Sequence, residues 1–122
     1  MNESRPDEHV LIESNELTLV SASRSTGEPR EDVLRFVYED GVVYLLARAR
    51  KPEEWFRNVE KDRGVVLRVK RRGFRGRASP VGGAERSQTI TRITARFRQK
   101  YGPAFPPGDS ADWQLVRIQI EF

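Results

Sequence analysis

Five cationic side chains are spaced so that folding could gather them at one end of a predicted hairpin. They are Arg24, Arg30, Arg48, Arg50 and Lys51. Asp40-Gly41 is a strong turn signal between two alternating apolar segments, and a hairpin there would bring the far ends of its strands together. Cations held so close repel one another unless an anion or several carboxylates share the space. The pattern therefore predicts a binding site for an anionic cofactor.

Neighbouring carboxylates offer a simpler explanation of the same cluster. Glu28, Glu31, Asp32 and Glu53 lie close enough along the chain to neutralise these cations on the surface. In that case the cluster would bind no ligand. From the residues alone, both explanations remain open.

Few residues are suited to nucleophilic, acid–base or metal chemistry. The chain has no Cys, and its one His, His9, lies in a polar N-terminal segment. Glu53 and Glu54 follow Pro52 at the expected start of a helix, where carboxylates complement the helix dipole. No metal-ligand spacing and no phosphate-binding GxxxxGK[ST] loop occurs. These features argue against many hydrolases and metalloenzymes.

The composition indicates one small, highly charged domain. The chain has 122 residues, with 22 basic against 18 acidic side chains and a net charge of +4. Most of the cations are Arg, which binds phosphate and carboxylate groups in a two-point geometry. The longest apolar run falls short of the roughly 18 residues of a membrane span, and the polar start is unlike a signal peptide. We therefore expect a soluble, cytoplasmic protein.

Hydrophobic periodicity predicts a mainly β protein with two helices. We expect six strands, near residues 17–23, 30–39, 42–47, 65–70, 74–81 and 113–122. A short helix should follow the third strand, and a longer one, over residues 84–101, should precede the last. Residues 1–15 form a polar leader, frayed up to residue 9, in which residues 10–12 cap the barrel or form a short helix. Residues 16–122 form a single antiparallel barrel domain.

The same patterns predict which side chains are buried. Ile90, Ile93, Phe97 and Tyr101 recur at helical spacing, and Val116, Ile118, Ile120 and Phe122 alternate inward on the last strand. Phe74, Gly76 and Ala78 share one face of the fifth strand, with Arg75 and Arg77 on the other. Arg92, Arg96 and Lys100 form a row that we expect to be solvated.

An ordered set of local sequences resembles a known superfamily. Ser23 to Arg30 (SRSTGEPR) is similar to a G-R-K-S/T-G-x-P-R turn, and Trp55 to Val59 (WFRNV) is similar to a W-Y/F-x-N-L helix start. The strand ending in Asp40-Gly41 and the segment Arg75-Gly76-Arg77-Ala78 complete the set. Together they resemble the FMN-binding split β-barrel superfamily, which includes pyridoxamine 5'-phosphate oxidase-like proteins. The branch most similar is the deazaflavin (F420)-dependent nitroreductase family.

The resemblance implies a six-stranded antiparallel split β-barrel and a set of cofactor-binding positions. The turn would contribute Arg24, Thr26, Gly27 and Arg30; the segment after the third strand would contribute Arg48, Arg50 and Lys51; and the helix start would contribute Trp55 and Asn58. Ser25 stands where the branch usually has Lys, which removes one cation that would face a phosphate.

The resemblance also implies an activity. The expected cofactor is coenzyme F420, with FMN as the alternative, and the expected reaction is hydride transfer to a quinone, a nitro compound or another unsaturated small molecule. Such a cofactor carries the chemistry itself, so no protein nucleophile is needed. The alternative is a non-catalytic split barrel that binds FMN, haem or another anionic ligand. Related barrels often dimerise, so a homodimer is also possible.

A competing class is a nucleic-acid-binding barrel. Six cations crowd the predicted hairpin of the fourth and fifth strands: Arg68, Lys70, Arg71, Arg72, Arg75 and Arg77. A basic curved surface can bind a phosphate backbone. However, aromatic side chains do not alternate with these cations, as base stacking would require, and the net charge is modest.

Overall fold

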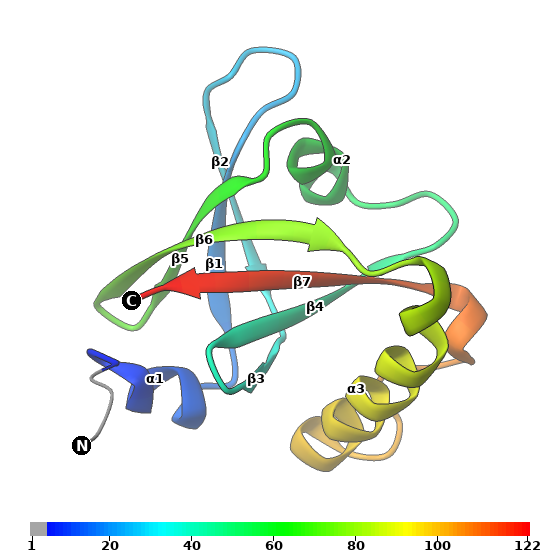
Figure 1. Ribbon diagram of the computed structural model, residues 1–122. Helices are drawn as coiled ribbons and strands as arrows, with labels where there is room; N and C mark the ends of the chain where they lie inside the picture. The colour runs from blue at the N-terminus through cyan, green and yellow to red at the C-terminus, as the bar shows by residue number, and fades with distance from the viewer. Residues whose placement is uncertain (1–4) are drawn as a thin grey trace.

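One curled, antiparallel sheet of seven strands forms the body of the protein (Figure 1). The computed structural model describes residues 5–122, so the first four residues of the expected leader lie outside the described part. The strands are β1 (Leu17–Ala22), β2 (Pro29–Leu34), β3 (Val37–Glu39), β4 (Val42–Arg48), β5 (Gly64–Val69), β6 (Arg72–Pro80) and β7 (Trp113–Glu121). Their order in the sheet is β2-β1-β5-β6-β7-β4-β3, so β2 and β3 form its two edges. The prediction of a mainly β split barrel is confirmed.

The strand count is seven rather than six because the expected strand 30–39 is broken in the middle. Residues 29–34 pair with β1, in the register Leu17↔Leu34, whereas β3 pairs with β4, in the register Val37↔Tyr44. The expected long hairpin at Asp40-Gly41 therefore includes only the last three residues of that segment. The rest of the segment lies at the opposite edge of the sheet.

Side chains of the long helix α3 (Arg86–Tyr101) cause this break. The N–H of Phe36 donates to the Tyr101 hydroxyl at 2.9 Å, and its carbonyl accepts from Lys100 Nζ at 2.9 Å. Both backbone groups of Phe36 are thus satisfied without a neighbouring strand. The alternating pattern of residues 30–39 could not reveal this, because the partners lie 64 or more positions away in the chain.

Lys100 makes the stability of this packing dependent on pH. Burial and the charge of Arg96 lower the pKa of Lys100 to about 8, against about 10.4 in an unfolded chain. Between these values the unfolded state binds more protons, so the contribution of Lys100 to stability rises with pH. We expect the free energy of unfolding of the wild type to rise relative to that of Lys100→Met between pH 8 and about 9.5. Denaturant unfolding of both proteins at several pH values would check this, and a constant difference would contradict it.

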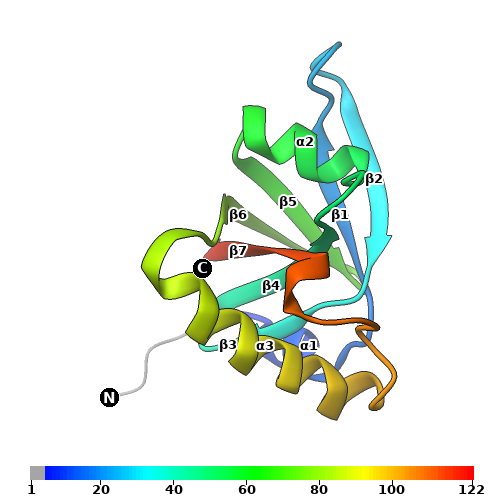
Figure 2. The same cartoon turned by 90° about the vertical axis from the view of Figure 1, so that its right-hand side faces the viewer.

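Two hydrophobic clusters lie on opposite faces of the sheet. The barrel interior is filled from β1, β4, β5, β6 and β7, with Leu19, Leu45, Leu67 and Ile118 fully buried. The second cluster lies between α3 and the outer face of β3, β4 and β7. Strand β4 is buried on both faces for this reason. In Figure 2, α3 runs along the end of the molecule that holds β3 and β4.

Four further helical elements complete the fold. Helix α1 (Glu8–Glu13) contributes buried Val10 and Leu11, so the helix begins inside the segment that we expected to be frayed. Helix α2 (Glu54–Lys61) lies beside the β1–β2 turn (Figure 1), and the short 3-10 helices η1 (Gly83–Glu85) and η2 (Ser110–Asp112) flank α3 and β7. No helix within residues 5–122 is long and apolar enough to cross a membrane.

Most of the burial expectations are confirmed, with two exceptions at the surface. Phe122 is 44% exposed and lies edge-on to Phe74, because β7 ends one residue earlier. The row of cations on α3 is not simply solvated: Arg92 and Arg96 both pair with Glu39, and Lys100 lies over the Phe36 ring. The partner Glu39 is supplied by β3, which sequence spacing on the helix alone does not show.

Candidate functional site

The turn between β1 and β2 is held in shape by its own polar groups. Ser23 Oγ accepts from the backbone N–H of Ser25 and of Thr26, each at 3.3 Å. The N–H of Gly27 donates to the Ser23 carbonyl at 2.7 Å, and Gly27 has a φ of 78°. Only glycine adopts this left-handed conformation without strain. Gly27 therefore closes the turn, as its position in the motif predicted.

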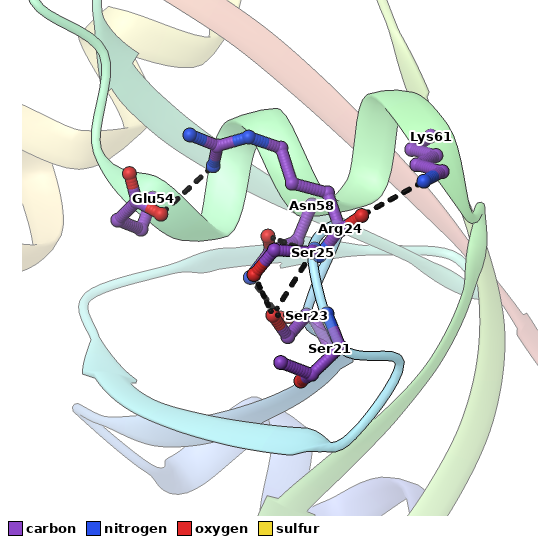
Figure 3. Close-up of polar contacts among 8 residues, drawn as sticks. Ser21, Ser23, Arg24, Ser25, Glu54, Asn58 and Lys61 are labelled. Carbon is purple, nitrogen blue, oxygen red and sulfur yellow. Dashed lines mark hydrogen bonds and ion pairs between the residues drawn. The ribbon is translucent and has the colours of Figure 1, made fainter.

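Asn58 on α2 fixes this turn to the body of the protein (Figure 3). Its side-chain oxygen accepts from the backbone N–H of Arg24 at 3.1 Å, and its amide nitrogen donates to Ser21 Oγ at 3.3 Å. Lys61, one turn later on the helix, donates to the Arg24 carbonyl at 2.8 Å. Asn58 is only 3% exposed, so both of its hydrogen bonds are shielded from water.

We expect Asn58→Ala to lower the free energy of unfolding by about 2 kcal/mol, because two buried polar groups lose their partner. Urea unfolding would measure the loss, and hydrogen exchange of the Arg24 amide should accelerate with it. Glu60→Ala, at an exposed position of the same helix, is the matched control and should change stability by less than about 0.5 kcal/mol. A loss in Asn58→Ala no larger than in this control would contradict the anchoring role.

Arg24 is already paired with a carboxylate. Its guanidinium donates to Glu54 Oε1 at 2.8 Å (Figure 3), and this bond lowers the pKa of Glu54. Glu54 stands in the first turn of α2, so the same carboxylate also complements the helix dipole. The pair is exposed, so its contribution to stability is small. Arg24 is thus neutralised on the surface, but by Glu54 and not by any of the four carboxylates expected to do so.

A groove lies between the end of β2 that is far from the turn and the end of β4. One cavity of about 210 Å³ is bounded by Val33, Leu34 and Arg35 on one side and by Leu46, Arg48 and Glu53 on the other. A second cavity of about 360 Å³ adjoins it, shares Arg48 and Trp113, and reaches Arg50. Phe97, Phe105 and Trp113 form an aromatic wall. The groove thus combines a flat apolar wall with cationic side chains.

The other four predicted cations are exposed, and two of them, Arg48 and Arg50, line the groove. Arg30 on β2 is exposed, as are Arg48, Arg50 and Lys51. Within residues 5–122, none of these four forms a salt bridge to a carboxylate. Glu53, an expected neutraliser, accepts instead from the backbone N–H of Arg48 at 2.9 Å. Four cations are therefore available to bind an anionic ligand.

The turn and the groove segment approach each other by a different route from the expected hairpin. Strand β2 does not pair with β4; Arg48 instead lies opposite Trp113 on β7. The two basic segments are connected through the start of α2, where Glu54 binds Arg24 and Glu53 binds the backbone of Arg48. The neighbouring Asp32 has its pKa raised by burial, while Arg30 partly opposes that shift.

Two of the predicted residues differ in how they can contribute. Thr26 is exposed on the turn, and its Oγ1 accepts from the N–H of Glu28 at 3.2 Å. Trp55 is 1% exposed and lies inside the barrel core, edge-on to Phe56. Its indole N–H has no hydrogen-bond partner among the described residues. Trp55 anchors α2, and a contact with a cofactor stays a prediction.

Sequence reasoning missed the aromatic wall and Arg35. Trp113 and Phe105 follow α3, far from the turn motif, and no spacing connects them with it. Arg35 lies over the Phe105 ring at 4.5 Å and over the Tyr101 ring at 5.3 Å. These contacts depend on the break after β2, so only the tertiary structure brings the three residues to the groove.

The basic hairpin β5–β6 forms as expected, with two of its cations paired: Arg68 binds Glu31 at 2.7 Å, and Arg72 binds Asp7 at 2.9 Å. Residues 64–80 contain no aromatic side chain other than buried Phe74. This surface therefore offers no exposed aromatic side chain on which a nucleic-acid base could stack. Among residues 5–122, no group of three acidic or His side chains is placed to hold a metal ion.

Solved structures share this fold. A FAD-binding protein from Mesorhizobium loti is 20% identical with a TM-score of 0.75, covering 94% of this chain and 87% of that one. HutZ, a heme storage protein from Vibrio cholerae, is 19% identical with a TM-score of 0.73 and coverage of 94% and 87%. An F420 reductase is 16% identical with a TM-score of 0.69, covering 98% of this chain and 97% of that one. At such identities these likenesses show the fold alone.

Sequence comparison is more specific. The search of curated proteins finds no match. The family model described as F420H(2)-dependent quinone reductase matches residues 7–103, which include the turn, the groove segment, α2 and all of α3. The match confirms the resemblance to deazaflavin-dependent reductases. This chain therefore belongs to the F420H(2)-dependent quinone reductase family.

Proposed function

We propose that this protein is a reductase that binds coenzyme F420 in the groove between β2 and β4 and reduces a quinone, a nitro compound or another unsaturated small molecule. FMN is the alternative cofactor. The family supports the cofactor class. The observation that carries the proposal is the set of four cations without a carboxylate partner, within residues 5–122, near a groove with an aromatic wall.

The residues present fit an anionic cofactor with a planar ring. Arg48 and Arg50 line the groove, and Arg30 and Lys51 stand exposed on the adjoining segments. Guanidinium groups bind phosphate and carboxylate groups in two-point geometry, and Lys supplies a point charge. These four residues would hold the phosphate and the acidic tail of the cofactor. A ring would lie against the wall that includes Leu46, Phe105 and Trp113.

The turn would contribute mainly through its backbone. Arg24 is held by Glu54 and Asn58, so its position is fixed while part of its charge is neutralised. No atom lies within 4 Å of a Cβ built on Gly27, and this open backbone lines a separate cavity of about 350 Å³ that also includes Arg75 and Arg77. Thr26 is exposed beside it. The Ser25 departure removes one cation from this turn, and the Arg-rich groove segment supplies others.

The protein's part in the chemistry is to bind, orient and exclude water. When bound, reduced coenzyme F420 would supply a hydride, and a quinone that takes up this hydride and one proton from solvent would become a quinol. The aromatic wall would keep water from the face of the ring. No nucleophilic side chain is required, in agreement with the absence of Cys.

Fluorescence titration of the purified protein with F420, and separately with FMN, tests the cofactor. We expect F420 to bind more tightly, and the reduced form to be reoxidised by menadione only when the protein is present. Binding of FMN alone would assign the protein to a flavin-dependent reaction. Binding of neither would overturn the proposal. Light scattering with and without cofactor would show whether a homodimer forms, which stays a prediction.

Storage of haem is less well supported by the described residues. The one His in the chain, His9, is exposed on α1 and lines neither cavity of the groove. The groove therefore has no His side chain to serve as the axial ligand of a haem iron. Titration with haemin under the same conditions would serve as the comparison.

A further inference from the structure

A larger cavity, of about 880 Å³, adjoins the proposed cofactor groove. It lies between the link from α1 to β1, the outer side of β1, β2 and β5, and the end of α3. Val33 and Arg35 line both this cavity and the groove. A molecule in the cavity would therefore be next to a ring held in the groove. Its volume is in the range that takes a drug-sized ligand.

The lining of this cavity is unusually cationic. Four cations contribute to it, Arg35, Arg68, Lys70 and Lys100, against the two carboxylates Glu13 and Glu16. Arg68 is neutralised by Glu31 at 2.7 Å. Arg35 is held over aromatic rings and Lys70 stands exposed at the hairpin turn, and neither pairs with a carboxylate within residues 5–122. The cavity therefore has positive charge to offer an anion.

Among the cations of this cavity, Lys100 is the one whose charge an anion would stabilise most. Its Nζ lies 3.8 Å from the centre of the Phe36 ring and donates one hydrogen bond, to the Phe36 carbonyl. Burial lowers the pKa of this ammonium to about 8, with Arg96 as a second cause. At pH 7 the group is still charged but has lost part of its hydration. A ligand carboxylate would replace that hydration.

Apolar surface lies beside these charges. Val33 is 64% exposed, although it is a large aliphatic residue on a strand. The Tyr101 ring also lines the cavity, with its hydroxyl engaged 2.8 Å from the Phe36 carbonyl. An apolar ring could cover Val33 while an acidic substituent contacts the cations. Binding of a cofactor in the groove does not by itself account for an exposed Val33 beside the cations of this second cavity.

We propose that this cavity binds an acid of the aromatic or quinone class through Lys70, Lys100 and Arg35, and that an acid of the quinone class is the hydride acceptor, becoming a quinol when it takes up the hydride and one proton. The second part rests on the proposed function. The preferred acceptor would then be a quinone that carries a carboxylate or sulfonate group, rather than a neutral quinone.

Calorimetric titration with 2-naphthoate and 2-naphthamide at pH 7 tests the binding site. The two probes share a ring and differ in charge, and neither needs a cofactor. We expect the wild type to bind the acid about tenfold more tightly than the amide. Lys70→Gln and Lys100→Gln should each reduce this preference about threefold, whereas Arg77→Gln, at the other end of the β5–β6 hairpin, should leave it unchanged. Lys70 is exposed, so its variant remains informative if Lys100→Gln fails to fold.

Equal affinity for acid and amide, no binding of either, or equal effects of all three variants would overturn the proposed site. The acceptor is tested with reduced F420, by comparing kcat/KM for 1,4-naphthoquinone-2-sulfonate and for menadione. A preference for the sulfonate that falls in Lys70→Gln supports the whole inference, and a preference for menadione overturns its second part. If the acid binds selectively but neither quinone oxidises reduced F420, the proposed function fails and the aromatic-acid site stands.

Discussion

Replacing Gly76 by Ala is expected to lower the free energy of unfolding by about 2–3 kcal/mol. Gly76 lies on β6 between β5 and β7, in register with Val65 and Ile120. A Cβ at this position would lie 2.6 Å from Ile118 Cγ2 and 3.0 Å from the backbone oxygen of Gln119. Ile118 is fully buried and the second atom belongs to a paired strand, so neither can move freely. Urea or thermal unfolding would measure the loss.

Gly73→Ala is the matched control for this substitution. Gly73 lies three residues earlier on the same strand, and no atom is within 4 Å of a Cβ built there. Its φ is not in the left-handed region. We expect a change within about 0.5 kcal/mol. Equal losses for the two variants would show that the contact with β7 does not decide the effect at Gly76.

The second large effect concerns cofactor affinity. The double variant Arg30→Gln/Arg48→Gln should weaken binding of F420 by roughly 100-fold, because each substitution removes one charge-assisted contact worth about 1.4 kcal/mol. Both side chains are exposed and neither pairs with a carboxylate within residues 5–122, so the fold should be unaffected. Fluorescence titration gives the affinity, and the unfolding midpoint reports on the fold.

The control for charge is Arg63→Gln/Arg77→Gln, which changes the net charge by the same amount at exposed positions outside the groove. This double variant should lower the affinity less than about threefold at 0.15 M salt, where distant charges are screened. Similar losses in the two double variants would mean that F420 responds to net charge alone. Unchanged affinity in Arg30→Gln/Arg48→Gln would count against the proposed site.

Much of the fold could be predicted from local sequence because the signals are local. The alternation of Phe74, Gly76 and Ala78 with Arg75 and Arg77 places β6 correctly, since side chains alternate across a strand. The hairpin β3–β4 forms at Asp40-Gly41. The failures occur where a distant group decides. At Phe36, Tyr101 and Lys100 replace strand hydrogen bonds, which separates β2 from β3.

In the candidate site too, some features could be predicted from the sequence and others depend on tertiary packing. Its cations and its turn could be read from residue types, because Arg recognises anions and Gly27 permits a left-handed turn. Residue types could not show which of these cations are free to bind a ligand. The packing of α2 decides this, because it brings Glu54 to Arg24 and Glu53 to the Arg48 backbone.

The sequence by itself determined the strand and helix types, the Ser23–Arg30 turn and the cationic character of the segments beside it. Side-chain periodicity and turn chemistry act over a few residues, so they can be read along the chain. Only the tertiary structure decided that β2 and β4 border a groove, that Trp113 and Phe105 form its wall, and that Arg35 joins it to a second cavity. These features depend on contacts between residues far apart in the sequence, and local patterns do not specify such contacts.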